Sequence, residues 1–235
     1  MSNELVIGRQ DLSLYASKTL RVLFSKILEN DMEFKEYTFG VTELANAVNA
    51  DVSRISHDSE KIVNELAFKG LRIKEPTGRI VAIPWAPYAE YDPVSRKFTI
   101  QLNERLAPFL LGLENYFTSY SIDVACGFGT VYGLRLFELL KKENYGAEFS
   151  VRHKTNIYLS VENIRFACGL DEYDEKGKLV RKKLAQIVNL REKLIDPAIR
   201  DIGSVFPTMK ITYEPKKAGK SIVGYFFIIT PLGVK

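Results

Sequence analysis

Hydrophobic residues recur with the period of an α-helix over a long stretch in the last third of the chain. Steps of about 100° per residue from Leu184 place one apolar set on a single helix face: Ile187, Val188, Leu194, Ile195, Ala198, Ile199 and Ile202. The opposite face collects cations and amides without a carboxylate, namely Lys182, Gln186, Asn189, Lys193 and Arg200. The pattern predicts one long helix that begins near Lys182 and buries its apolar face.

Two strands of alternating polarity follow this helix. Ile211 and Tyr213 alternate with polar neighbours in the first strand, and Tyr225 and Phe227 do so in the second. A basic turn over residues 215–220 joins the two strands, which predicts a β-hairpin. A helix followed by a basic hairpin is typical of the winged-helix fold. In that fold the helix enters a major groove of DNA, and the hairpin, or wing, reaches the flanking backbone.

The first half of the chain shows a similar order of elements. Serine, threonine and asparagine caps open amphipathic stretches, and a Pro-Thr-Gly turn separates two short strands. These signals predict a helix-turn-helix followed by a second wing. The expected elements are a helix after Ser13 or Ser17, helices over residues 42–48 and 53–70, a hairpin over residues 71–83, a strand over residues 98–102 and a helix capped by Asn103.

Further helix signals precede the long helix of the second half. Thr130 opens one helix, and Ser160 opens another that ends at Gly169. Helix, helix-turn-helix and wing therefore occur twice, although the two halves share no obvious residue-level identity. We predict an α+β protein with two tandem winged-helix domains, residues 1–113 and residues 114–235.

Composition places the chain among ordinary globular proteins, because 46% of its 235 residues are hydrophobic and 26% are charged. We expect a cytoplasmic protein without membrane contact, since the sequence shows no apolar leader and no run that approaches the length of a membrane span. Cys126 and Cys168 are too few for a disulfide framework. Both have apolar or glycine neighbours, so they are predicted to be buried thiols.

The net charge of +4 is unevenly distributed along the chain. Residues 1–115 contain 14 Lys and Arg against 16 Asp and Glu, whereas residues 116–235 contain 19 against 13. From Lys176 to Lys235 there are 13 basic and 4 acidic side chains, a concentration that suits a polyanion. We therefore expect double-stranded DNA as the partner of the second domain.

The cationic helix face and the hairpins supply the candidate DNA contacts. Cations neutralise phosphates and release counterions, and the amides of Gln186 and Asn189 can offer a donor and an acceptor together to an adenine edge. A solvated helix face is the alternative, and the face alone favours neither reading. The candidates are Lys182, Lys183, Gln186, Asn189, Lys193, Lys216, Lys217 and Lys220 in the second domain, and Ser53, Arg54, His57, Lys61 and Arg79 in the first.

Other chemistries find little support in the sequence. Gly219-Lys220-Ser221 imitates the end of a phosphate-binding loop, but Glu214 stands where such a loop requires glycine. His57 and His153 are far apart, so neither a zinc site nor the paired-histidine centre of a rolling-circle nickase can be built locally. A solvated loop explains the acidic run over residues 171–175 better than a metal site does. We expect no catalytic residue, no metal and no cofactor.

A set of short motifs in a fixed order extends over nearly the whole chain. The first half contains Trp85 and the motifs LAPFL (106–110) and FTSY (117–120); the second half contains YGLRLFELL (132–140), LSVE (159–162), CGL (168–170), IDPAI (195–199), YEPKKAGK (213–220) and VGYFFI (223–228). This set resembles the RepB-like initiator replication proteins of iteron-type plasmids.

The resemblance implies a fold, partners and one more candidate residue. It implies two winged-helix domains, of which the second reads directly repeated origin sites (iterons) and the first holds a homodimer and makes auxiliary DNA contacts. The dimer would repress its own gene, the monomer would start replication, and host helicase machinery would be recruited. The family is commonly basic at Arg191, which joins the candidate DNA contacts although regular helical spacing puts it on the inner side.

We therefore expect a non-enzymatic plasmid replication initiator that binds iterons, distorts or helps open an adjacent AT-rich region, and exists as a homodimer in equilibrium with the monomer. A winged-helix transcriptional repressor without an initiator role is the nearer alternative, but such a repressor usually carries one winged domain per protomer. A replication nickase or primase is the more distant alternative, and the missing ligand clusters weigh against it.

Overall fold

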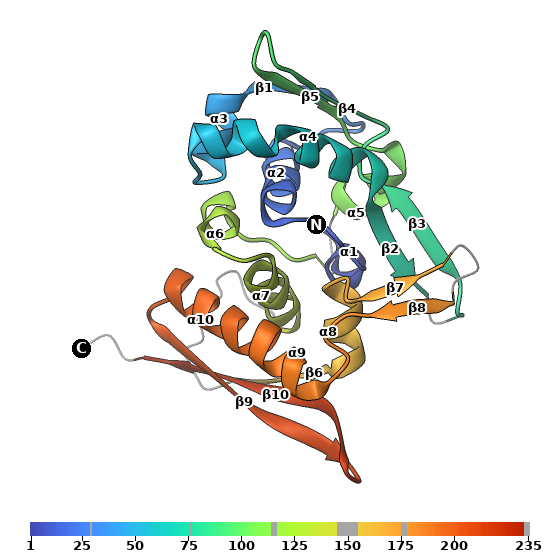
Figure 1. Ribbon diagram of the computed structural model, residues 1–235, viewed down its shortest axis with the longest axis vertical. Coiled ribbons are helices and arrows are strands. Elements are labelled where there is room, and N and C mark those ends of the chain that lie inside the picture. Colours follow the sequence, from blue (N-terminus) through green and yellow to red (C-terminus); the bar gives the residue numbers. More distant parts are fainter. Residues whose placement is uncertain (29, 76, 114–116, 145–154, 175–177, 233–235) are drawn as a thin grey trace. The chain divides into compact units, whose positions relative to one another are not determined.

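The computed structural model describes residues 1–28, 30–75, 77–113, 117–144, 155–174 and 178–232. These residues form two units, Met1–Gly127 and Phe128–Lys235, and each has its own buried core and its own three-stranded sheet (Figure 1). Both units have the winged-helix order of elements, so the predicted fold class is confirmed. Within the described ranges, no helix combines the length and the apolar character that a membrane span requires.

Three helices form the centre of the first unit. Helix α4 (Val52–Phe68) packs on both α2 (Leu14–Ser25) and α3 (Val41–Ala47). Ile55, Ile62 and Leu66 follow a helical period along α4 and are almost completely buried. The turn between α3 and α4 contains Asn49 at φ +53°, a conformation that asparagine tolerates, and the predicted helix-turn-helix is confirmed. The remaining helices are α1 (Asn3–Ile7), η1 (Glu104–Leu106), α5 (Ala107–Leu110) and α6 (Ile122–Gly127).

The first unit contains two separate hairpins after α4. One hairpin consists of β2 (Gly70–Lys74) and β3 (Ile80–Pro84) and forms a two-stranded sheet of its own. The other consists of β4 (Tyr88–Asp92) and β5 (Lys97–Gln101), and β5 also pairs with β1 (Glu36–Gly40) in an antiparallel sheet of order β1-β5-β4. A wing is the hairpin whose last strand pairs with the strand before the helix-turn-helix, which in this unit is β4–β5. The hairpin predicted over residues 71–83 exists, but its assignment as the wing is wrong.

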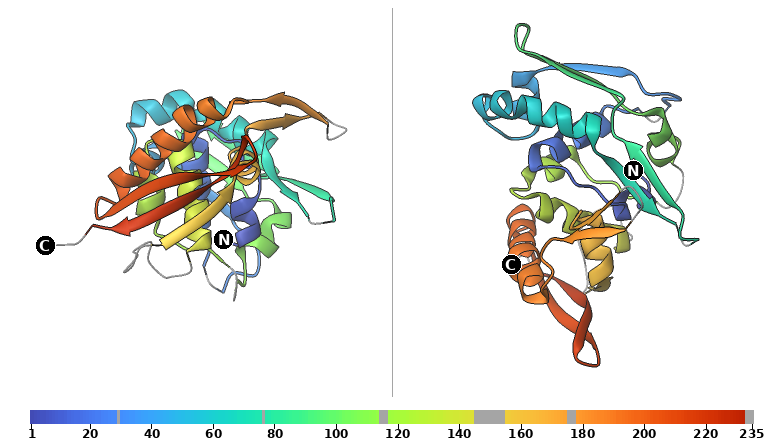
Figure 2. Two further views of the ribbon diagram at one scale, coloured as in Figure 1. Left: turned by 90° about the horizontal axis from the view of Figure 1, so that it is seen from below. Right: turned by 45° about the vertical axis from the view of Figure 1, so that its right-hand side comes forward.

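The second unit is a sheet of order β6-β10-β9 covered on one face by helices (Figure 1). Tyr225, Phe227 and Ile229 alternate along the central strand and are buried, and α8 and α10 pack against the sheet. An extra hairpin of β7 (Asp171–Tyr173) and β8 (Leu179–Lys182) precedes the last long helix (Figure 2). This helix follows α8 in the helix-turn-helix and is called the recognition helix, the usual term for that position in the winged-helix fold. The elements are α7 (Val131–Glu143), β6 (Thr155–Ser160), α8 (Val161–Ala167), β7 (Asp171–Tyr173), β8 (Leu179–Lys182), the recognition helix over residues 187–205, β9 (Met209–Ala218) and β10 (Ser221–Pro231).

The recognition helix contains a π-helical turn. It consists of α9 (Ile187–Leu190), the π turn η2 (Arg191–Ile195) and α10 (Asp196–Val205). Pro197 lacks an N–H, and in a regular α-helix its ring would collide with the carbonyl of residue 193. A widened turn before the proline relieves that collision.

The π turn shifts the phase of the helix, so the predicted burial of Val188 is wrong. Leu190 is 1% exposed and belongs to the core, whereas Val188, predicted to be buried, is 49% exposed. The predicted start near Lys182 is also wrong, because Lys182 ends β8 and Leu184 has φ +49°. The helix begins at residue 187, with Gln186 as its N-cap.

Several local predictions can be compared with the structure. Ser13, Thr130 and Ser160 occupy N-cap positions as predicted, whereas α3 and α4 begin slightly earlier than expected. The expectation of a solvated loop at the acidic run is wrong for residues 171–173, which form strand β7 and pair with β8. Both cysteines are buried, and burial raises the pKa of the Cys126 thiol to about 11 and that of Cys168 to about 12.

Some predictions are not tested by the structure. Pro76 in the predicted turn, Glu175 in the acidic run and His153 lie outside the described ranges. The expectation that His57 and His153 do not form a metal site is therefore untested. Helix α6 packs against α2 within the first unit, after the predicted boundary. The assignment of residues 1–113 and 114–235 to the two domains stays a prediction.

Candidate nucleic-acid interface

The start of the recognition helix gathers four of the candidate residues. Gln186 caps the helix, and the Nδ2 group of Asn189 donates a hydrogen bond to its Oε1 at 3.4 Å. The two amides therefore lie side by side, and each carries a donor and an acceptor of the kind that can pair with an adenine edge. Lys182 and Lys183 precede the helix rather than belonging to it, and Nζ of Lys183 forms an ion pair with Glu172 at 2.9 Å.

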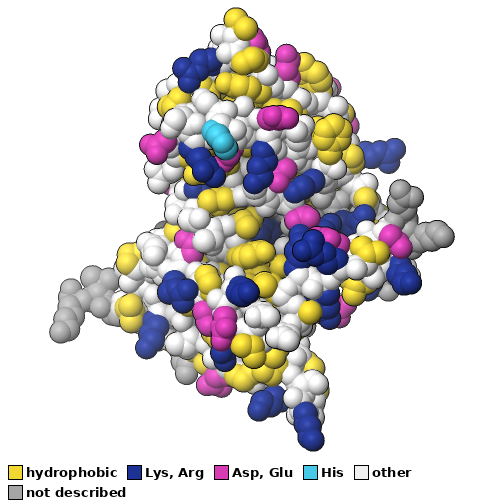
Figure 3. Space-filling model, in the orientation of Figure 1, with side chains coloured by type: hydrophobic (Ala, Val, Ile, Leu, Met, Phe, Trp, Pro, Cys, Tyr) yellow, Lys and Arg dark blue, Asp and Glu magenta, His cyan; other side chains and the backbone are white. Residues whose placement is uncertain are grey.

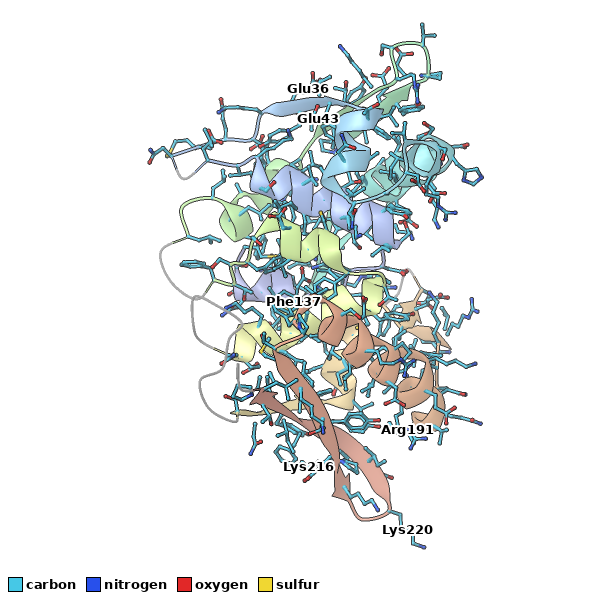
Figure 4. The ribbon with its side chains drawn as sticks, turned by 90° about the vertical axis from the view of Figure 1, so that its left-hand side faces the viewer. Glu36, Glu43, Phe137, Arg191, Lys216 and Lys220 are labelled. Atoms are coloured by element: carbon cyan, nitrogen blue, oxygen red, sulfur yellow. The ribbon has the colours of Figure 1, made fainter. Side chains whose placement is uncertain are left out.

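The middle of the recognition helix presents charged residues between two buried leucines. Leu190 and Leu194 are almost completely buried, while Arg191, Glu192 and Lys193 are exposed. Arg191 forms an ion pair with Glu192 at 3.1 Å, and its Nε lies 3.9 Å from the carboxylate of Asp196. Regular spacing puts Arg191 on the inner side, but the structure places it on the outer surface (Figure 4). Lys193 forms no ion pair within the part of the chain that the structure describes.

Arg165, which the sequence did not suggest, fixes the chain just before the helix. Its side chain is 4% exposed and forms an ion pair with Asp171, and Nε lies 3.1 Å from Oδ1 of that carboxylate. Its guanidinium also donates to the carbonyl oxygens of Lys183 at 2.7 Å and Leu184 at 2.9 Å. These bonds satisfy backbone groups at the point where the chain reverses with Leu184 at positive φ. Arg165 therefore sets where the recognition helix begins.

The wing of the second unit, β9–β10, carries three candidate lysines. Ala218 pairs with Ser221, so Gly219 and Lys220 form the turn, and Gly219 has φ +59°, which favours glycine. Lys217 and Lys220 are exposed and form no ion pair among the described residues. Figure 3 shows cationic side chains at the end of this hairpin, and Figure 4 shows Lys220 pointing away from it. The wing therefore offers charges that phosphates can approach.

Lys216 differs from the other two lysines of the wing. Its Nζ lies 4.6 Å from the ring centroid of Tyr158 and 5.9 Å from that of Phe226. The ammonium is held over two aromatic faces, which attract a cation. Lys216 is therefore positioned on the sheet rather than extended from the tip.

A hydrogen bond joins the wing to the recognition helix. The hydroxyl of Tyr213, on β9, donates to Oδ1 of Asp196, on α10, at 2.6 Å. Burial and this hydrogen bond to a carboxylate raise the pKa of Tyr213 well above its ordinary value, so the hydroxyl stays protonated and continues to donate. Because Asp196 also lies near Arg191, the exposed surface of the helix and the wing strand share one polar network.

The candidate DNA contacts of the first unit are less favourably placed for binding phosphates than those of the second. Ser53, Arg54, His57 and Lys61 are all exposed on α4. Asp58 accepts from His57 Nδ1 at 3.0 Å and from Arg54 Nε at 2.9 Å, and these interactions lower the pKa of the Asp58 carboxyl. Arg54 and His57 therefore have a carboxylate beside them that opposes phosphate binding. Arg79 lies in the β2–β3 hairpin, 3.5 Å from Glu75, and not in the wing.

The arrangement suits binding to nucleic acid. The second unit combines surface amides and cations at its helix with exposed lysines on its wing, the combination that pairs base reading with phosphate contacts. No group of three or more His, Cys, Asp and Glu side chains in the described ranges is placed to hold a metal ion. The two units, with the basic helix and wing of the second, define a tandem winged-helix protein.

The family of the chain follows from its match to two family descriptions. Residues 1–141 match "Initiator Replication protein, WH1", and residues 160–229 match "Initiator Rep protein, WH2". These matches cover most of the chain, which therefore belongs to the family of initiator replication proteins. The resemblance inferred from the motifs is confirmed, and the second match includes the whole recognition helix and most of the wing.

Three solved structures are similar to the chain. The crystal structure of the Pi initiator protein in complex with iteron DNA has a TM-score of 0.72 and 14% identity, covering 98% of this chain and 95% of that one. Domains 2 and 3 of RctB have a TM-score of 0.49 and 10% identity, covering 93% and 83%. The WH1 domain of MSBI1.176, a replication protein isolated from a multiple sclerosis patient, has a TM-score of 0.29 and 17% identity, covering 46% and 82%. The likeness to the Pi protein shows a shared fold over nearly the full length.

Proposed function

We propose that the protein starts plasmid replication by binding directly repeated origin sites in double-stranded DNA, with the second unit as the principal reader. The observation that carries this proposal is the helix and wing of the second unit, with Gln186 and Asn189 at the start of the helix and Lys217 and Lys220 on the wing. Membership of the initiator family supports it. The Pi protein, which shares the fold, was crystallised with iteron DNA.

The candidate contacts divide into two roles. Gln186, Asn189 and Lys193 lie on the recognition helix or cap it and would face base edges, with Arg191 beside them. Lys182, Lys183, Lys216, Lys217 and Lys220 would contact phosphates and fix the register of the helix in the groove. In the first unit, Ser53, Arg54, His57, Lys61 and Arg79 would make auxiliary contacts.

Binding to defined duplexes tests the proposal. The probes carry one, two or four copies of a direct repeat from the replicon that encodes the chain, and a scrambled duplex of equal length is the control. We expect repeats to bind at least about 10³-fold more tightly than scrambled DNA, with affinity falling steeply as salt rises. Equal affinity for repeated and scrambled DNA would refute the proposal.

We also infer that the protein forms a homodimer, in equilibrium with the monomer, that represses its own gene. This inference rests on the family resemblance. Light scattering after size exclusion, over a range of concentrations, measures the equilibrium, and a reporter fused to the promoter of the gene measures repression. A monomer at all concentrations, or an unrepressed reporter, would remove the dimeric repressor from the proposal.

Recruitment of the host replication machinery is the third part of the proposal, and it also rests on the resemblance. Purified host helicase should be retained on origin duplexes only when the protein is bound to them. Retention that is equal with and without the protein would contradict this part while leaving the DNA-binding proposal intact.

A further inference from the structure

Two side chains of different character occupy the outward middle of the recognition helix. Val188 is 49% exposed, and the side chain of Glu192, four residues later, is 53% exposed. Each of them precedes a buried leucine by two residues, Leu190 and Leu194 respectively, so both face away from the core. Leu190 and Leu194, which point into the core, are also four apart and lie on the other side. Val188 and Glu192 therefore form an outward pair, with Arg191, Asn189 and Lys193 around them.

Neither member of this pair suits a phosphate backbone. An aliphatic side chain gains nothing from a phosphate, and a carboxylate is repelled by it. Each has a matching group in the major groove, because thymine presents its C5 methyl there and cytosine presents its N4 amino donor. Val188 is also β-branched, so its orientation in a helix is nearly fixed and little side-chain entropy is lost on contact.

The surroundings of Glu192 make its approach to DNA feasible. Arg191 lies 3.1 Å from its carboxylate and balances its charge at the surface. The nearby cations of the helix start and the wing add attraction for the DNA as a whole. The carboxylate can therefore enter the groove as an acceptor without a large electrostatic penalty.

We propose that Val188 and Glu192 read pyrimidines in the bound site, Val188 through a thymine methyl and Glu192 through a cytosine amino group. This inference rests on the proposed function and adds the class of base edge that the helix recognises. Four residues of helix rise about 6 Å, and base pairs are spaced about 3.4 Å apart. The thymine and the cytosine should therefore lie about one or two base pairs from each other.

Replacement of single thymines by deoxyuridine tests the role of Val188, because it removes only the methyl group. Replacement of one particular thymine of the repeat should lower the affinity of the wild-type protein for the duplex about fourfold, the equivalent of one buried methyl group. In Val188→Ala, the same replacement should change affinity by less than about 1.5-fold, because the partner is gone. A thymine scan without any methyl dependence, or the same dependence in both proteins, overturns the assignment.

Glu192→Gln tests the second member of the pair. Replacement of one C·G pair near that thymine by T·A should lower the affinity of the wild-type protein for the duplex about tenfold. In Glu192→Gln the discrimination at that pair should fall below about threefold, while other positions keep theirs. An equal change in affinity for every duplex, repeated or scrambled, would show that Glu192 acts only through charge and would overturn its assignment.

The two proposals fail in different ways. Wild-type protein that does not prefer repeats over scrambled DNA refutes the proposed function, and the pyrimidine assignment falls with it. Wild-type protein that prefers repeats but shows no dependence on Val188 or Glu192 refutes only the pyrimidine assignment. Thermal unfolding of each variant is expected at the midpoint of the wild type because both side chains are exposed, and it separates loss of contact from loss of fold.

Discussion

The carboxylate of Asp201, on α10, holds Thr130, the N-cap of α7, by two hydrogen bonds. It accepts from the Thr130 N–H at 2.8 Å and from its hydroxyl at 2.7 Å, and it also accepts from the Gly129 N–H at 2.9 Å. The Thr130 hydroxyl in turn accepts from the Gly133 N–H at 2.9 Å. A negative charge is favourable at a helix N-terminus. The second half of the recognition helix is therefore fixed to the first helix of its unit.

Replacing Asp201 with alanine should destabilise the second unit. The change removes the acceptor of three hydrogen bonds, so we expect the free energy of unfolding to fall by about 1–3 kcal/mol. Urea denaturation followed by circular dichroism measures the fall. Glu214→Ala, at an exposed strand position in the same unit, is the matched control and should change stability by less than about 0.5 kcal/mol. Equal midpoints for the two variants would contradict the role of Asp201.

Gly133→Ala should weaken the same contact from the other side. A Cβ at position 133 would lie 2.1 Å from Oδ2 of Asp201, so the carboxylate must move and its hydrogen bonds must lengthen. We expect a loss of about 1–3 kcal/mol in the wild-type background and a smaller loss in Asp201→Ala, where the carboxylate is absent. Urea midpoints of the two single variants and the double variant give the coupling. Additive losses would show that Gly133 does not act through Asp201.

Arg165→Met should weaken binding to the repeat more than binding to scrambled DNA. The change leaves Asp171 without its main partner and removes donors to the carbonyls of Lys183 and Leu184, so the start of the recognition helix loses its anchor. We expect affinity for the repeat to fall by about tenfold or more, with less effect on scrambled DNA. Fluorescence anisotropy on both duplexes measures the ratio.

The exposed Arg181 provides the control for Arg165. Its guanidinium is 3.9 Å from Glu172, in the same hairpin region, and carries the same charge. Arg181→Met should reduce affinity for both duplexes by a similar factor, because only a surface charge is lost. A uniform loss for Arg165→Met as well would remove its role in positioning the helix.

The starts of α7 and α8 and the wing hairpin of the second unit were predictable from the sequence because their signals are local. N-cap residues at Thr130 and Ser160 and the glycine turn of the wing marked the elements correctly. The phase of the recognition helix was not predictable from regular spacing. The π turn before Pro197 rotates the residues on its two sides relative to each other, which exposes Val188 and buries Leu190.

Features that depend on distant contacts could not be predicted. In the first unit the sequence shows a hairpin over residues 71–83, but nothing local indicates that β5 rather than β3 pairs with β1. Arg165 gave no signal, because its role depends on carbonyl groups 18 and 19 residues away. The candidate lysines of the wing do lie on a hairpin, but the predicted turn over residues 215–220 is wrong. Lys216 and Lys217 lie in β9, and the turn consists of Gly219 and Lys220 because Ala218 pairs with Ser221.

Lys217→Ala and Asn189→Ala should separate phosphate contacts from base reading. Lys217 is exposed on the wing, so its loss should weaken binding to repeated and scrambled DNA alike and reduce the salt slope by about 1. Asn189 lies beside the cap of the recognition helix, so its loss should cost about 1–3 kcal/mol at selected base pairs only. Binding isotherms across a salt series measure both effects. An equal loss on repeated and scrambled DNA for Asn189→Ala would remove it from base reading.

Glu65→Gln should alter the acid sensitivity of the first unit. Glu65, on α4, accepts from the Ser13 N–H at 2.6 Å and from Lys69 Nζ at 2.9 Å. Burial alone would raise the pKa of the carboxyl, but these hydrogen bonds and the charge of Lys69 outweigh it and hold the pKa below its ordinary value of 4.5. A carboxyl whose pKa is lower in the folded state binds protons more readily when unfolded. Its stabilising contribution is therefore complete above its unfolded pKa.

That contribution is lost as the pH falls through the lowered pKa of the folded state, which defines the measurement. The free energy of unfolding of wild type should exceed that of Glu65→Gln most at neutral pH. The difference should shrink towards zero in acid, where Glu65 is protonated in both the folded and the unfolded protein. Urea midpoints at a series of pH values from neutral to about 3 follow the difference. Glu43→Gln, an exposed position paired with Lys26, is the control and should show little difference at any pH because the pair is solvated. A gap between wild type and Glu65→Gln that does not change with pH would mean that the Gln side chain fails through packing, and that the charge of Glu65 does not stabilise the junction of α4 with α2.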